Sequence, residues 1–100
     1  QRRQNKEAFL RVVLMYSVEL SQKASKFLDK LDKHLSGRIE ERLKILADDP
    51  LPSDSKFIGR HEGDKVLRLR IGDYRALYKI KEKEKVVLIT KIDKRDRVYQ

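Results

Sequence analysis

Hydrophobic and polar residues alternate along much of the second half of the chain, a pattern typical of strands with one buried face. Leu67, Leu69 and Ile71 occupy one side of such a segment. Arg68 and Arg70 occupy the other side. The same pattern predicts strands near residues 57–61, 65–71, 74–81 and 85–92. The last of these is almost wholly apolar, as a strand in the middle of a sheet tends to be.

A tight turn is predicted between the second and third of these strands. Gly72-Asp73 has the composition of a two-residue hairpin turn. Arg75 follows directly on the returning strand, where we expect it to rejoin the face that carries Arg68 and Arg70. Three cations held side by side on a sheet favour an anionic partner.

A helical periodicity precedes these strands. Ser21 is a plausible N-cap. The apolar residues behind it have a helical spacing and form one stripe: Ala24, Phe27, Leu28, Leu31 and Leu35. Ser36-Gly37 interrupts this pattern, and a second helix is predicted from there to Pro50. Its apolar positions are Ile39, Leu43, Leu46 and Ala47. The chain therefore predicts a helical hairpin after a first strand that begins near Tyr16.

The predicted fold class is α+β. It has an N-terminal strand, a helical hairpin and an antiparallel meander, with one sheet whose first face packs on the helices and whose second face is open, concave and basic. At 100 residues the chain has the length of a single domain, expected at residues 15–100. Residues 1–14 differ in composition, and we interpret them as an extension or a start-site artefact; a helix with a binding role is the alternative.

Charge narrows the functional classes. The chain has 25 Lys and Arg against 16 Asp and Glu, a net charge of +9, which favours nucleic acid, an acidic protein or an anionic membrane as partner. No apolar run approaches the roughly 18 residues of a membrane span, and no signal peptide is evident, so we expect a soluble cytoplasmic protein. Absence of cysteine excludes disulfides. His34 and His61 are too few for a histidine-bearing metal cluster, so neither metal nor cofactor is expected.

The C-terminal tail adds more cations and an aromatic residue. It directly follows the last predicted strand, and its relevant residues are Lys94, Arg95, Arg97 and Tyr99. We expect them to reach the end of the sheet and close over the open face. A basic groove with an aromatic edge suits a single-stranded nucleic acid, held through its phosphates and one stacked base.

The chain resembles the RelE family of toxins from toxin–antitoxin pairs, which share a superfamily with ParE toxins. The resemblance rests on the strand and turn L-R-L-R-I-G-D-Y-R-A-L-Y, on the terminal K-R-D-R-V-Y and on the order of elements. The many lysines and glutamates and the scarce amide side chains are a bias of hyperthermophile proteins, consistent with an archaeal-like member. The resemblance implies an endoribonuclease that cleaves messenger RNA on the ribosome by attack of a 2'-hydroxyl, without a metal.

The resemblance also implies roles for individual residues. Arg75 would stabilise charge on the phosphorane, Arg68 would be the basic residue of the preceding strand, and Arg95 the tail arginine. Tyr99 would stack on the cleaved nucleotide. Val66 stands where the best-known bacterial pattern has a lysine that is a favoured general base, so slow cleavage is a possible outcome.

Further basic residues are expected to bind RNA: Arg70, Lys79, Lys91, Lys94 and Arg97. Arginine stays protonated and cannot serve as a base, whereas a lysine crowded by arginines can. The candidates for the base are Lys79, Lys91 and Lys94.

The implied partners are the ribosome-bound message and a RelB-like antitoxin, acidic and largely helical, in a possible heterotetramer. DNA would be bound only indirectly through that complex, and no membrane is expected. Two alternative functions remain, namely a ParE-like toxin that acts on a topoisomerase by protein contact and a non-catalytic RNA- or ribosome-binding module.

Structural readings of the same residues also remain open. Arg68 and Arg70 could pair with Glu62 or Glu82, and Arg75 with its neighbour Asp73. Tyr74 and Tyr78 are read as core residues, and neither histidine has a partner evident from the sequence.

Overall fold

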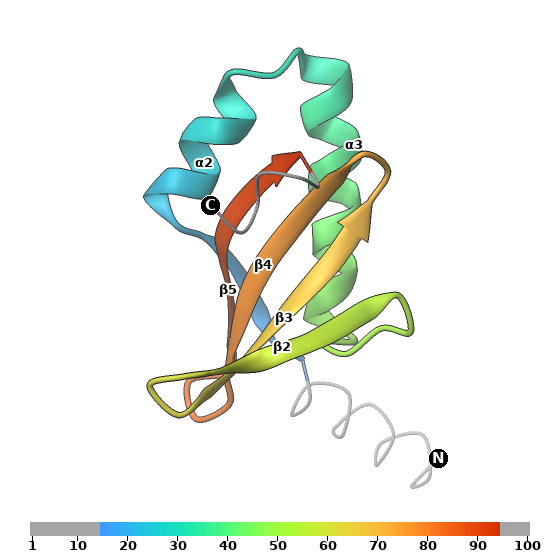
Figure 1. Cartoon of the computed structure of the whole chain (residues 1–100). Coiled ribbons are helices and arrows are strands. Elements are labelled where there is room, and N and C mark those ends of the chain that lie inside the picture. The colour runs from blue at the N-terminus through green and yellow to red at the C-terminus, as the bar shows by residue number, and fades with distance from the viewer. Residues whose placement is uncertain (1–14, 95–100) are drawn as a thin grey trace, which may run out of the picture.

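The computed structural model describes residues 15–94, which form one five-stranded sheet with two helices on one face (Figure 1). The elements in chain order are β1 (Ser17–Leu20), α2 (Gln22–Asp29), α3 (Lys33–Lys44), the 3-10 turn η1 (Ile45–Ala47), β2 (Ser55–His61), β3 (Asp64–Ile71), β4 (Tyr74–Lys81) and β5 (Val86–Lys94). The strand order is β1-β5-β4-β3-β2. β1 runs parallel to β5 and the other neighbours are antiparallel. The predicted α+β fold is confirmed.

The helical hairpin begins as predicted but divides at a different residue. The Ser21 hydroxyl accepts a hydrogen bond from the Ala24 amide at 3.1 Å, which caps α2. The predicted break at Ser36-Gly37 is wrong, because both residues lie inside α3. Asp32 instead caps α3 by accepting from the Leu35 amide at 3.0 Å. A glycine in a helix costs only about 1 kcal/mol, which burial of the apolar face of α3 offsets.

The strand boundaries differ little from the predicted ones. β4 matches, β2 and β3 begin slightly earlier, and β5 extends to Lys94. Residues 1–14 lie outside the described residues, so the proposed domain start stays a prediction. None of the helices in residues 15–94 is both long and apolar enough to cross a membrane.

The core lies between the sheet and the helices and is made of one face of every long strand. Leu69, Ala76 and Ile89 are completely buried in it. Tyr78 is also completely buried and donates a hydrogen bond from its hydroxyl to the Pro50 carbonyl at 2.7 Å. The core reading of Tyr78 is therefore confirmed, and its hydroxyl ties the loop after η1 to the sheet.

Replacing Tyr78 by Phe should reveal the contribution of that buried hydroxyl. At neutral pH we expect a loss of about 1–3 kcal/mol in the free energy of unfolding, because the Pro50 carbonyl is left without its donor. Burial raises the pKa of Tyr78 above its ordinary value of 10.0. A raised pKa in the folded state means that the wild type loses stability as the pH rises above about 10. Urea unfolding from neutral to alkaline pH should therefore show the gap between the two proteins narrowing, and a constant gap would contradict this assignment.

Candidate nucleic-acid interface

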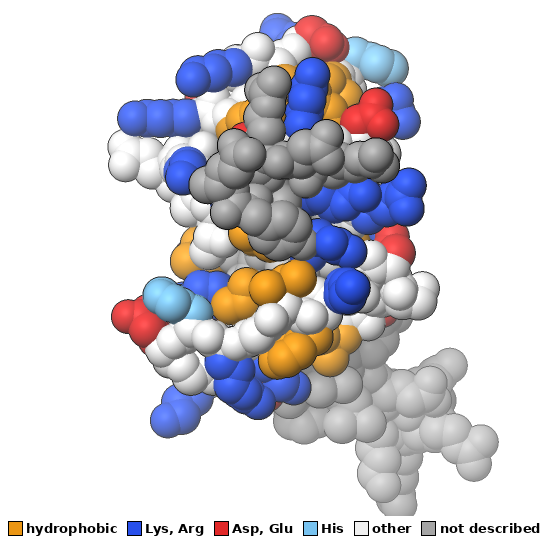
Figure 2. All heavy atoms as spheres, viewed as in Figure 1, with side chains coloured by type: hydrophobic (Ala, Val, Ile, Leu, Met, Phe, Trp, Pro, Cys, Tyr) orange, Lys and Arg blue, Asp and Glu red, His pale blue; other side chains and the backbone are white. Residues whose placement is uncertain are grey.

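The face of the sheet that points away from the helices carries basic side chains from four strands. Figure 1 shows α3 behind β3 and β4, so this open face is turned toward the viewer. In the same view several Lys and Arg side chains lie at the surface (Figure 2). The face extends over β2, β3, β4 and β5 in consecutive order.

The strand register brings the three predicted arginines onto this face. Arg70 lies directly opposite Arg75, and Arg68 lies opposite Leu77. Directly opposed Cβ atoms in antiparallel strands are about 5 Å apart and diagonal neighbours about 7–8 Å. Arg68 and Arg75 are diagonal neighbours in this register, close enough for both guanidinium groups to reach one phosphate. The alternation of the sequence therefore places the arginines on one face.

The turn between β3 and β4 restrains Arg75. The residue is only 8% exposed, and Nη1 donates hydrogen bonds to the carbonyls of Gly72 at 3.2 Å and Tyr74 at 3.0 Å. Gly72 has a φ of 59°, a left-handed conformation that glycine adopts without strain. Asp93 on β5 lies opposite Arg75 in the register. An irregularity at Leu77/Tyr78 shifts that register, so the sequence alone did not indicate Asp93 as a neighbour.

A second basic centre on the open face is Lys79, which is also 8% exposed. Its Nζ lies 3.3 Å from Glu62 Oε1 and 3.8 Å from Asp64 Oδ2. It also lies 3.1 Å from His61 Nδ1. The hydrogen bond from Lys79, together with its charge, lowers the pKa of Glu62. In the register Lys79 lies directly opposite Val66.

His61, for which the sequence indicated no partner, contacts Lys79 in the structure. Its Nδ1 faces the Lys79 ammonium, which can only donate, so Nδ1 of the neutral ring accepts this hydrogen bond and Nε2 carries the ring hydrogen. The reason lies in the two-residue turn at Glu62 and Gly63, whose φ angles are 54° and 86°. That turn pairs His61 with Asp64 and directs both toward Lys79. A turn signal flanked by polar residues was the only indication of this cluster in the sequence.

The remaining predicted RNA-binding residues differ in position. Lys91 lies opposite Leu77 and so belongs to the open face. Lys94 lies opposite Tyr74, which packs against the core, so the register gives Lys94 the orientation of the helix-covered side, at the exposed end of β5. The tail residues Arg95, Arg97 and Tyr99 lie outside the described residues. Lys56 on β2 is a basic residue of the open face that sequence reasoning missed.

Two pairs of cations lie directly opposite one another on the open face. Arg70 opposes Arg75, and Lys56 opposes Arg68. Like charges directly opposite one another destabilise a strand pair by up to about 1 kcal/mol. A bound polyanion removes this repulsion, and the guanidinium fork matches phosphate oxygens in a bidentate manner. The open face therefore suits an extended phosphodiester backbone.

Metal ligation has no comparable support in the described part of the chain. Within residues 15–94, no three or more His, Asp or Glu side chains are grouped so that they could hold a metal ion.

Comparison with known proteins finds relatives that are described as toxins. Residues 18–99 match the family described as ParE toxin of type II toxin-antitoxin system, parDE. A Methanocaldococcus jannaschii protein that carries the toxin name RelE1 is 28% identical over 88 residues, which cover 87% of this chain and 98% of the relative.

Among solved structures, the chain is similar to one in the archaeal RelE-RelB complex from Pyrococcus horikoshii, with 31% identity, a TM-score of 0.73, and coverage of 83% of this chain and 98% of the other. It is also similar to a chain of the toxin-antitoxin complex RelBE2 from Mycobacterium tuberculosis, with 29% identity, a TM-score of 0.67, and coverage of 81% and 92%.

Proposed function

The chain belongs to the family of ParE toxins of type II toxin–antitoxin systems, and from this premise we propose that it is a RelE-type endoribonuclease that cleaves messenger RNA on the ribosome. The observation that supports this most is the convergence of Arg68, Arg70 and Arg75 on the open face of the sheet. Arg75 is nearly buried and restrained by two backbone carbonyls, as a group that must meet a transition state in a fixed geometry should be.

The proposed reaction is a transfer of the phosphodiester within the RNA. The ribose 2'-oxygen attacks the adjacent phosphorus, its proton leaves to a base, and the bond to the 5'-oxygen breaks as that oxygen gains a proton. Negative charge grows on the non-bridging oxygens, where Arg75 and Arg68 would lie. Fixed cations that stabilise the charge of the transition state more than the charge of the ground state lower the barrier by about 3 kcal/mol each. Arg95 would add a tail cation and Tyr99 would stack on the nucleotide.

Proton transfer in this mechanism is assigned to lysine, because arginine does not deprotonate. Lys79 and Lys91 both belong to the open face, whereas Lys94 does not share its orientation. The ammonium of Lys79 already has the carboxylates of Glu62 and Asp64 beside it. We propose that Lys79, with these carboxylates beside it, supplies positive charge and a proton, and that Lys91 stays a candidate for the base. No metal ion is required in this scheme.

We further propose that a RelB-like antitoxin neutralises the chain, since both similar structures named above are toxin–antitoxin complexes. Such a partner would be acidic and would meet the net charge of +9. The pair could assemble further into a heterotetramer and reach DNA only through the antitoxin. The site of action would be the cytoplasm, where translating ribosomes are.

A second candidate function follows from the family description, which names ParE toxins. A ParE-like protein would poison a topoisomerase by protein contact and would have no need for a restrained arginine next to further cations. Loss of supercoiling activity by a topoisomerase in the presence of the purified chain would favour this candidate.

The proposed function is tested by induced expression with and without the neighbouring open reading frame, followed by primer extension on one message. We expect growth arrest and cuts confined to the translated codons, and neither when the neighbouring frame is co-expressed. The untranslated region of the same message is the internal control. Growth arrest with an intact message and altered plasmid supercoiling would instead support the topoisomerase alternative.

A further inference from the structure

A cluster at one end of the open face holds a lysine that is less exposed than the groups that bind it. The Lys79 side chain is 10% exposed, whereas those of His61 and Glu62 are 67% and 76% exposed. Lys79 comes from β4, His61 from β2 and Glu62 from the turn that joins β2 to β3. His61 has no part in the mechanism proposed above, although it makes the shortest of these contacts with Lys79, at 3.1 Å.

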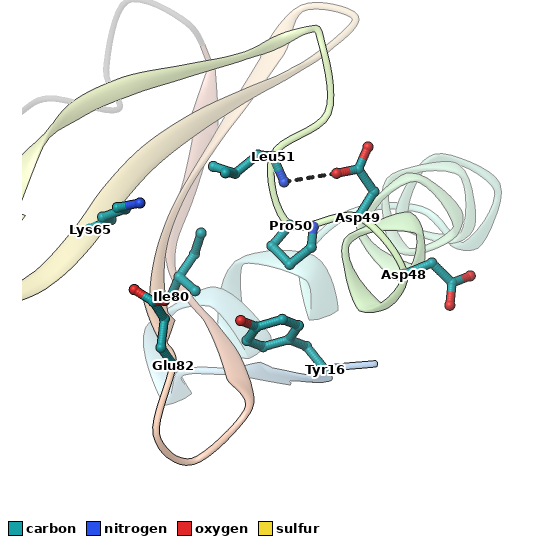
Figure 3. Close-up of a pocket in the computed structure, with 8 residues that line it drawn as sticks. All are labelled: Tyr16, Asp48, Asp49, Pro50, Leu51, Lys65, Ile80 and Glu82. Atoms are coloured by element: carbon teal, nitrogen blue, oxygen red, sulfur yellow. Dashed lines mark hydrogen bonds between the residues drawn. The ribbon is translucent and has the colours of Figure 1, made fainter. Parts of the chain in front are cut away.

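Strand alternation explains why these groups meet on the open face. Lys65 and Ile80 lie opposite one another, and both line a cavity of about 230 Å³ on the helix-covered side of the sheet (Figure 3). Their chain neighbours Asp64 and Lys79 therefore point to the other side. His61 is the register partner of Asp64 and joins them there. The cluster is thus separated from that cavity by the thickness of the sheet.

The ammonium of Lys79 has three N–H bonds, and neighbouring side chains take two of them. Nζ lies 3.1 Å from His61 Nδ1 and 3.3 Å from Glu62 Oε1, both within hydrogen-bond distance. Asp64 Oδ2, at 3.8 Å, adds an opposite charge but lies beyond that distance. The bonds of an ammonium nitrogen are tetrahedral, so fixing Cε and two hydrogen bonds leaves one direction for the third N–H. Within residues 15–94 no acceptor lies at hydrogen-bond distance from that third N–H.

His61 differs from Glu62 as an anchor, because a proton can abolish its acceptor. The hydrogen bond from Lys79, together with its charge, lowers the pKa of Glu62, so this carboxylate stays ionised in the range in which histidines titrate. A protonated imidazole carries a hydrogen on both nitrogens and accepts nothing. His61 Nδ1 also lies 3.5 Å from Glu62 Oε1, so a protonated ring would compete with Lys79 for the same oxygen.

We propose, on the premise of the proposed function, that His61 is a positioning residue whose neutral ring, together with Glu62, directs the remaining N–H of Lys79 toward the bound RNA. The step concerned is the proton transfer from Lys79. In it the Nζ–H bond breaks as a bond forms between that proton and the departing 5'-oxygen, and water later returns a proton to the amine. His61 contacts neither the RNA nor the reacting atoms in this scheme and acts only through Lys79.

The rate test is a double-mutant cycle on the full chain. We expect His61→Leu to lower the single-turnover cleavage rate about 10-fold, less than the about 10²-fold of Lys79→Val, because a residue that acts through the amine cannot cost more than the amine itself. In the Lys79→Val background, His61→Leu should change the rate no further. His34→Leu, the same exchange at an exposed position near the start of α3, should leave the rate unchanged in both backgrounds. Equal losses from His61→Leu with and without Lys79 would overturn the proposal.

A pH profile separates positioning from packing. His61→Asn keeps an acceptor, since the amide oxygen can take the place of Nδ1, but this side chain does not titrate. Its rate should match that of the wild type while the His61 ring is neutral. As the pH is lowered and the ring resonances of His61 report its protonation, the rate of the wild type relative to His61→Asn should fall. A ratio that stays constant while the ring titrates would contradict the role of Nδ1. The charged groups that face His61 in this range are Lys79 on β4, Asp64 on β3 and Glu62 in the turn, with Lys81 near Glu62.

A measurement on the isolated protein separates failure of this inference from failure of the proposed function. Nuclear relaxation of the Lys79 ammonium nitrogen should show a restrained group in the wild type and in His61→Asn, and a more mobile group in His61→Leu. If the wild type does not cleave but its ammonium is restrained by His61 as expected, the proposed function fails and the positioning of Lys79 holds. Equal mobility in the wild type and His61→Leu would overturn the inference, whatever the cleavage rates.

Discussion

Replacing Arg75 by Ala is expected to lower the rate of messenger cleavage by about 10²–10³-fold, the effect of removing one well-placed donor to a developing oxyanion. Arg75 is nearly buried and its guanidinium is held by the carbonyls of Gly72 and Tyr74, so it meets the phosphate in a fixed geometry that a more mobile cation does not reproduce. Single-turnover cleavage of a ribosome-bound message measures the effect. Ribosome binding should change little, because the other cations of the open face remain.

Two controls separate this effect from unfolding. Arg75→Lys keeps a positive charge but loses the planar fork, so we expect an intermediate rate. Arg60→Ala removes an arginine that lies opposite Lys65 and donates to the Gly63 carbonyl, and it should leave the rate unchanged. Thermal unfolding of all three variants shows whether the fold persists. A folded Arg75→Ala protein that cleaves at the wild-type rate would contradict the proposed role.

Replacing Lys79 by Val is expected to lower the cleavage rate by about 10²-fold, the lower end of the usual contribution of proton transfer. Lys79 lies directly opposite Val66, so the ammonium occupies the region that a lysine at position 66 would occupy from the neighbouring strand. The exchange variant, Lys79→Val combined with Val66→Lys, should recover much of the rate. It keeps one lysine on the same face, and Asp64, two residues before position 66 on β3, remains available to pair with it.

The exchange distinguishes a catalytic role of the ammonium from a purely structural one. If Lys79 has only a structural role, Lys79→Val should lower the thermal stability but leave the cleavage rate at low temperature unchanged. Lys65→Val is the matched control, because this lysine also lies on β3 but opposite the core residue Ile80, on the helix-covered face of the sheet. A double exchange variant as slow as Lys79→Val alone would show that the position of the amine on β4 is essential.

The sequence was informative wherever one periodicity governed a segment. Alternation from Leu67 to Ile71, with glycine at position 72, was enough to predict β3, its turn and the side of the sheet on which Arg75 lies. The helical hairpin was harder because two signals competed at its centre. Gly37 looked like a break, whereas Asp32 had the capping side chain that begins α3. A capping side chain acts through one hydrogen bond to a backbone amide. It can be recognised as the cap only when that amide is known, which for Asp32 is the amide of Leu35.

The candidate site was predictable only within one strand pair. Arg68, Arg70 and Arg75 follow from local register, but Lys56 and Asp93 join them from β2 and β5, whose registers are shifted by irregularities at Phe57/Gly59 and Leu77/Tyr78. Such a shift reverses which residues share a face, and no residue pattern marked it. The His61 contact with Lys79 depends on a side chain that reaches across β3, which periodicity cannot indicate.

The parallel pairing of β1 with β5 constrains when the sheet can be completed during synthesis of the chain. β1 is complete early, yet its partners are Val86 to Ile89, close to the end of the chain. Contacts so far apart in sequence form late, and folding during synthesis proceeds from the N-terminal side at the pace of elongation. A nascent chain therefore lacks β5, which joins β1 to the rest of the sheet, and a finished basic face while it is still attached to the ribosome that makes it. Under the proposed function, an inhibitor and a ribosome can first compete for the chain once it has been released and the sheet has closed.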